Sequence, residues 1–206
     1  MYTKTEELWN TYSHGVGILL SIIALVLLLS FDTEKNAFST LSILLYGISL
    51  IVLYTASTIY HAVRSSTLKR IFQKVDHICI YLLIAGTYSP VVLISLEDSA
   101  GWLIFWIVWG IAAVGTLLKV FFTGKFEIIS VLLYLVMGWL IILDFQALMD
   151  VQTQAGILLL ALGGLFYTVG IVFYAIEKIP YNHAIWHFFV LAGSIFHFFF
   201  IFLDVI

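Results

Sequence analysis

The six histidines of this chain include two that stand four residues apart, His183 and His187. In a helix this spacing is about one turn, so both imidazoles lie on nearly the same face. Helical zinc sites use this arrangement and take a third ligand from elsewhere in the chain. The pair therefore indicates a metal site, although two histidines at a membrane boundary could instead anchor the helix among lipid headgroups.

His61 is the natural third ligand, because it closes a long apolar segment at the same predicted end of the protein. Three neutral imidazoles and a water would give a tetrahedral site with an open position, which is the catalytic rather than the structural pattern for zinc. We therefore predict Zn²⁺ bound by His61, His183 and His187. His197 lies about 15 Å further along the helix, too far to bind the same ion, and is expected to make a polar contact within the bundle.

Asp76 and Ser57 are predicted to be catalytic residues beside the metal. A carboxylate near the end of a membrane span is costly unless it serves a charge or a proton, so Asp76 could act as a general base toward zinc-bound water. It could equally cap the start of a helix and face Lys74. Ser57 precedes His61 by one turn and could point toward the ion, although a serine inside a helix more often bonds the carbonyl one turn earlier.

Glu7, Asn10 and His14 are predicted to form a further polar stripe, since their spacing places them along one side of a helix. Glu7 could order basic groups or close the mouth of the site. An amphipathic segment lying at the membrane interface would give the same pattern.

The amino-acid composition indicates which environment surrounds the parts of the chain that must position these residues. The chain is 63% hydrophobic and only 10% charged, with a mean hydropathy of +1.11. A soluble domain normally carries about a quarter charged residues, so the bilayer is the solvent that fits. The net charge of −3 gives no basic patch and argues against nucleic acid as a partner. The single cysteine, Cys79, excludes an intramolecular disulfide.

Seven apolar windows are long enough to span a membrane, which takes about 20 residues each. They lie near 13–31, 38–62, 76–95, 101–122, 127–145, 155–176 and 183–204. The connections are too short to form a separate soluble domain. We therefore predict an all-α fold, a single membrane domain of seven transmembrane helices covering residues 1–206.

The basic residues predict the orientation of this bundle, because Lys and Arg prefer cytoplasmic loops. Eight of the nine fall on one side of the alternating loops, and Lys35 alone falls on the other. The eight are Lys4, Arg64, Lys69, Arg70, Lys74, Lys119, Lys125 and Lys178. We therefore expect the N-terminus inside, the C-terminus outside, and five histidines at the cytoplasmic ends of their helices. These are His14, His61, His77, His183 and His187.

Several short stretches together resemble a known family. In chain order they are Glu7-Leu-Trp-Asn10-Thr-Tyr-Ser13-His14, Ser57-Thr-Ile-Tyr-His61, Asp76-His77-Ile-Cys-Ile-Tyr81, Gly86-Thr-Tyr-Ser-Pro90, His183-Ala-Ile-Trp-His187 and His197. They are similar to the ordered signatures of the hemolysin III family, the bacterial branch of the progestin and adipoQ receptor proteins, which is related to alkaline ceramidases. The resemblance runs from the first predicted helix to the last.

The resemblance implies zinc on His61, His183 and His187, with Asp76 bonded to the zinc-bound water and Ser57 adjacent. It also implies a multi-pass protein of the bacterial cytoplasmic (inner) membrane with its N-terminus inside. The relation to ceramidases implies a zinc-dependent lipid amide hydrolase acting in membrane lipid homeostasis.

Three functions compete at this point. In the first, zinc lowers the pKa of bound water to about 7, Asp76 takes the proton, and a membrane lipid or fatty-acyl ligand places its chain in the apolar bundle interior. In the second, the protein is a receptor or membrane homeostasis factor without enzymatic activity, and its zinc is structural. The third is a pore-forming cytolysin, which this composition disfavours because a secreted pore former must first be soluble.

Overall fold

The computed structural model describes residues 3–122, 127–176 and 178–206, and every regular element in them is helical, which confirms the all-α prediction. The helices are α1 (Lys4–Phe31), α2 (Ser39–Ala62), α3 (Ser66–Pro90), α4 (Gly101–Phe122), α5 (Glu127–Gly138), α6 (Phe145–Val151), α7 (Gln154–Ala175) and α8 (Asn182–Phe200). π-Helical turns at Val91–Ser95 and Ile201–Val205 continue α3 and α8, and a 3-10 segment, Leu140–Asp144, joins α5 to α6.

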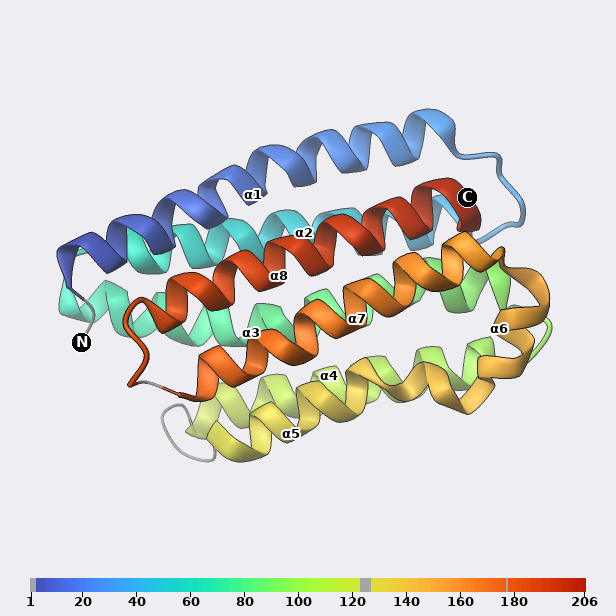
Figure 1. The fold of residues 1–206 in the computed structure, drawn as a ribbon. Helices are drawn as coiled ribbons and strands as arrows, with labels where there is room; N and C mark the ends of the chain where they lie inside the picture. Colours follow the sequence, from blue (N-terminus) through green and yellow to red (C-terminus); the bar gives the residue numbers. More distant parts are fainter. Residues whose placement is uncertain (1–2, 123–126, 177) are drawn as a thin grey trace.

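Within the described residues these helices form seven spans that are long and apolar enough to cross a membrane. α5, the 3-10 segment and α6 together make the fifth span. The spans pack in chain order around a ring, and α8 closes the ring by packing against both α7 and α1 (Figure 1). The chain is therefore a multi-pass membrane protein with an interior enclosed by its helices.

Two helices begin well before the apolar windows that predicted them. α1 begins at Lys4, behind a capping box in which Thr3 Oγ1 accepts from the Glu6 amide (3.2 Å) and Glu6 Oε2 accepts from the Thr3 amide (2.7 Å). α3 begins at Ser66 rather than near residue 76. The added turns are polar, so an apolar window cannot detect them.

The fifth span is interrupted after Gly138, and a tyrosine from α3 repairs the break. Tyr88 Oη donates to the Gly138 carbonyl (3.0 Å) and accepts from the Ile141 amide (3.0 Å). Irregular backbone at membrane depth is tolerated only where other protein groups satisfy it. α5 can therefore change direction beside the interior of the ring without exposing these polar backbone groups.

The buried face of α1 consists mainly of small and polar residues, so the helix lies close to its neighbours. Gly17 is the clearest case, because a Cβ at this position would collide with the Tyr54 ring. The edge of Tyr54 in turn meets the face of His14, with ring centroids 4.9 Å apart. This packing places the polar stripe of α1 against the ends of α2 and α8.

Candidate metal centre

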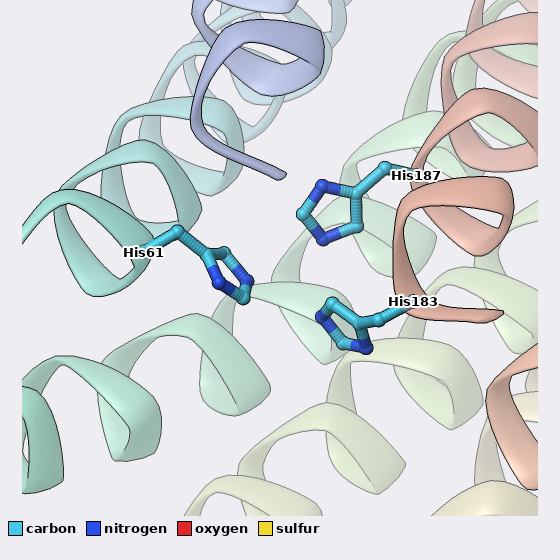
Figure 2. A group of neighbouring side chains, drawn as sticks. All are labelled: His61, His183 and His187. Carbon is cyan, nitrogen blue, oxygen red and sulfur yellow. The ribbon is translucent and has the colours of Figure 1, made fainter. Parts of the chain in front are cut away.

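Three histidine side chains converge inside one end of the ring. His61 comes from the last turn of α2, while His183 and His187 come from the first turns of α8 (Figure 2). All three are buried, and each contributes a nitrogen that lies within 4.8 Å of the nitrogens of the other two. The rings of His183 and His187 are 4.6 Å apart between centroids, and His61 is 5.0 Å from each. This buried group could hold a metal ion.

Residues of α1 orient two of these rings by hydrogen bonds to the nitrogens on their far side. His61 Nδ1 bonds Glu7 Oε2 at 2.6 Å. Asn10 Nδ2 also lies near this nitrogen (3.3 Å), but an amide nitrogen only donates and therefore does not bond a protonated Nδ1. His187 Nδ1 lies 3.2 Å from the Asn10 carbonyl and 3.1 Å from Ser13 Oγ. Carboxylate and carbonyl oxygens only accept, so in the neutral rings Nδ1 carries the proton and Nε2 is left as a metal donor. Such outer groups fix the tautomer and orientation of metal-binding histidines.

His14 and Lys69 complete this supporting shell. The His14 ring stacks on His187, with centroids 3.6 Å apart and planes within 7°. Lys69 Nζ lies 2.6 Å from Glu7 Oε1 and donates to the Tyr60 carbonyl (3.3 Å). Glu7 thus joins α1 to both α2 and α3. These contacts favour the interpretation that Glu7 orders basic groups, rather than the alternative of an amphipathic segment at the membrane interface.

Asp76 and Ser57 face the same cavity as His183 and His187. The proposal that Asp76 caps a helix is wrong, because α3 begins ten residues earlier and buries this side chain. The expected back-bond of Ser57 is also not made, although Ser21, Thr87 and Ser89 donate to carbonyls one turn earlier. The Ser57 hydroxyl instead lies close to the Asp76 carboxyl group.

The cavity continues from the histidine group into the apolar interior of the ring. It holds about 1030 Å³ of space between protein atoms, part of it open to the outside. Polar side chains gather at the histidine end, namely His14, Ser57, Asp76, His77, His183 and His187. Further in, the lining is mostly aliphatic and aromatic, including Leu83, Ile84, Leu135, Trp139 and Ile171.

Besides His14, two further histidines line this cavity without joining the group of three. His77 lies on α3 with Nδ1 3.9 Å from Glu127 Oε2, and this carboxylate also bonds the buried Lys119 Nζ (2.7 Å). His197 Nε2 bonds the Leu160 carbonyl (3.3 Å), which confirms its expected polar contact within the bundle.

Sequence reasoning gave no separate role to Ser13 or Lys69. Ser13 continues the stripe of Glu7 and Asn10 at another three-residue step, so helical spacing could have found it. Lys69 carried no such signal, because its contact with Glu7 depends on the polar extensions of α1 and α3.

The donor set fits the predicted metal. It consists of imidazole nitrogens, which suit zinc, copper, iron and nickel, and the described residues bring three such ligands together. Structural zinc sites usually have four protein ligands, whereas three protein ligands leave a position for water or substrate. A catalytic arrangement is therefore compatible with these residues.

Fold and site together define a multi-pass helical membrane protein with a buried three-histidine group that could hold a metal ion. The family model described as Haemolysin-III related matches residues 2–198 of the 206. The chain belongs to this family.

Curated relatives agree with the match. The chain is 44% identical over 195 residues to the Hemolysin-3 homolog of Bacillus subtilis, covering 94% of this chain and 92% of that protein. It is 43% identical over 195 residues to Hemolysin-3 of Bacillus cereus, covering 94% and 89%. It is also 29% identical over 203 residues to the human monocyte to macrophage differentiation factor, covering 96% and 83%.

Proposed function

We propose that the protein is a zinc-dependent lipid amide hydrolase of the bacterial cytoplasmic membrane, acting in membrane lipid homeostasis. One observation carries this proposal: His183 and His187 of the three-histidine group, together with Asp76 and Ser57, line one cavity whose remaining walls are mostly apolar. Such a cavity suits a ligand with a polar head and a hydrocarbon chain.

His61, His183 and His187 would hold the zinc ion. When bound, zinc supplies Lewis acidity, which polarises a carbonyl group and makes water more acidic. Glu7, Asn10 and Ser13 keep the ligand rings in place and in the right tautomer through the bonds described above.

Asp76 would hold the proton that the reaction moves. Its carboxylate can accept a proton from the attacking water and deliver it to the nitrogen of the departing amine. Ser57 lies beside this carboxyl group and can orient it by donating a hydrogen bond. The apolar walls exclude competing water and position the acyl chain, so that the amide carbon lies at the polar end.

A membrane homeostasis protein with purely structural zinc is the second candidate. The Glu7 bonds favour it, because they join α1, α2 and α3 at the metal end, where a bound ion would also join α2 to α8. Zinc would then brace the bundle and turn over no substrate.

The Asp76→Asn variant separates the two candidates. If the protein is a hydrolase, this variant should keep its zinc and melting temperature while release of fatty acid from a fluorescent N-acyl lipid falls by about 100-fold or more, since general acid–base groups contribute 10²–10⁴-fold. The measurements are zinc per chain, thermal melting and product release on one set of detergent preparations.

Two further variants complete this experiment. Asp98→Asn makes the same change at an exposed carboxylate and should match the unsubstituted protein. His183→Ala/His187→Ala should lose both zinc and activity. Unchanged turnover in Asp76→Asn would refute the role of Asp76, and full zinc in the double variant would refute the metal site. Zinc that stays in the unsubstituted protein and in Asp76→Asn, with no product released by either, would favour the structural role.

A further inference from the structure

His197 is held deep inside the bundle in one defined orientation. It lies on α8, and the edge of its ring formed by Cδ2 and Nε2 packs on Gly163 of α7, where a Cβ would collide with it. Nε2 bonds the Leu160 carbonyl at 3.3 Å. Nδ1 is the ring atom opposite that edge, so it points away from the α7 backbone.

This orientation also fixes which nitrogen of His197 carries the proton. A backbone carbonyl can only accept, so in the neutral ring Nε2 is the donor and Nδ1 keeps a free lone pair. Nδ1 has no hydrogen-bond partner among the residues that the structure describes, and the side chain is only 9% exposed. A buried acceptor that stays unsatisfied destabilises the fold, so the site suits a group that donates.

The neighbouring hydroxyl groups bond one another, and none of the described ones lies within hydrogen-bond reach of Nδ1. Tyr54 Oη donates to Ser194 Oγ (2.7 Å), and Tyr167 Oη lies 2.7 Å from the same oxygen. The Tyr167 ring packs near His197, with centroids 5.4 Å apart. Among the described residues, Nδ1 of His197 is therefore an acceptor that this hydroxyl cluster leaves unbonded.

The same cavity connects His197 to the three-histidine group. His187, Tyr167 and His197 all line it. His197 and His187 are on one helix, ten residues and therefore about 15 Å apart along its axis. A lipid chain whose head lies at the histidine group would pass His197 in its middle or distal part.

We propose that His197 forms a binding subsite for a hydroxyl group carried on the hydrocarbon chain of the lipid. The assignment rests on the proposed function only in placing the lipid head at the three-histidine group. Nδ1 requires a donor, which excludes ionised carboxylates and ester oxygens as its partner. A hydroxyl is the smallest donor that an acyl chain can bring this far into an apolar interior.

The test compares stearic acid with two hydroxystearic acids, one hydroxylated at mid-chain and one beside the carboxyl group. Each displaces a fluorescent fatty acid from the purified, zinc-loaded protein in detergent. The mid-chain acid should bind about three- to tenfold more tightly than stearic acid, the worth of one net hydrogen bond, and the other isomer should gain much less. Equal affinities for all three acids would overturn the proposal, and so would binding of none.

Variants assign the preference to His197. His197→Phe should bind stearic acid but lose the preference for the mid-chain hydroxyl. Thr87→Val is the matched control, because Thr87 also lines the cavity but its hydroxyl already bonds the Leu83 carbonyl (2.8 Å), and it should keep the preference. A preference for the mid-chain hydroxyl that survives in His197→Phe would refute the assignment. If that variant fails to fold, the comparison of the three acids on the unsubstituted protein still tests whether the cavity binds a mid-chain hydroxyl.

A last variant separates this proposal from the proposed function. His61→Ala, which removes a metal ligand, should abolish hydrolysis while the ratio of affinities for hydroxylated and plain chains persists. A preference without any zinc-dependent turnover would refute the hydrolase and leave the subsite standing. Zinc-dependent turnover by a protein that shows no preference for the hydroxylated chain would refute the subsite and leave the hydrolase standing.

Discussion

The two ends of the bundle use the same types of polar residue in different ways. At the end opposite the histidines, carboxylates bond backbone amides: Asp144 Oδ2 accepts from the Ala100 amide (2.9 Å) and Asp204 Oδ2 from the Thr153 amide (3.0 Å). At the histidine end, Glu7 bonds His61 and Lys69, and the Asp76 carboxyl lies beside the hydroxyl of Ser57.

This difference in partners separates structural from chemical roles. A carboxylate that accepts from a loop amide satisfies a donor left unpaired at a helix terminus, which is a structural role. A carboxylate that faces an imidazole or a cavity controls where a proton or a metal can go. The partner of an acidic residue is therefore more informative than its burial.

The two ends also differ in charge, which predicts the compartment that each faces. Seven of the eight basic residues that the structure describes lie at the histidine end, whereas acidic residues dominate the other end; Lys125 lies outside the described residues. Cys79 is buried, so new cysteines at the exposed positions Ser65 and Thr33 report the two ends over a low background. In intact cells a membrane-impermeant maleimide should label Thr33→Cys almost completely and Ser65→Cys only after permeabilisation.

The opposite labelling pattern would refute the N-inside orientation and would move the metal site to the outer side of the membrane. Labelling of the unsubstituted protein measures the contribution of Cys79 and serves as the background. Because labelling is all or none, this is the largest effect expected.

The shell around His61 should have the next largest effect. Glu7→Gln removes the charge that bonds His61 Nδ1 and Lys69 but keeps the size of the side chain. Loss of an outer-shell partner typically lowers metal affinity 10–100-fold, and we expect that range here. The measurement is zinc retention against a graded series of chelator concentrations.

Glu6→Gln is the matched control for this experiment. Glu6 is the neighbouring carboxylate, and it bonds backbone amides, those of Thr3 (2.7 Å) and Tyr181 (3.3 Å), rather than a histidine. It should hold zinc as the unsubstituted protein does. Equal affinity in Glu6→Gln and Glu7→Gln would mean that Glu7 does not support the metal site.

The membrane spans and the grouping of His61, His183 and His187 could be predicted because strong physical constraints show directly in the sequence. Lipid demands about 20 apolar residues per helix, and a shared ion demands that helical histidines recur one turn apart. Neither constraint depends on how the helices pack. His183 and His187 could therefore be recognised without any knowledge of their neighbours.

Roles that depend on packing could not be predicted in this way. Asp76 could be taken for a helix cap because six of the ten preceding residues are polar, whereas the helix already begins at Ser66. Ser57 was expected to bond its own helix, and only the position of α3 beside α2 brings it to Asp76. The bare nitrogen of His197 likewise follows from the glycine at 163, which lies on another helix.

Asp144 gives the smallest effect and tests the structural side of the comparison. Its carboxylate accepts from the Ala100 amide and the Ser99 hydroxyl (3.0 Å), so it ties the start of α4 to the junction before α6. Asp144→Ala should lower stability by about 0.5–2 kcal/mol, as for loss of a helix cap, and should leave zinc content unchanged. Asp150→Ala is the control. Among the described contacts, that exposed carboxylate bonds only Gln146 within its own short helix (3.0 Å). Because surface changes cost little, the melting temperature of this variant should stay within about a degree of that of the unsubstituted protein. Thermal melting and zinc analysis on the same detergent preparations decide the outcome, and loss of zinc in Asp144→Ala without loss of stability would show that the two ends do not divide structure from chemistry as their contacts indicate.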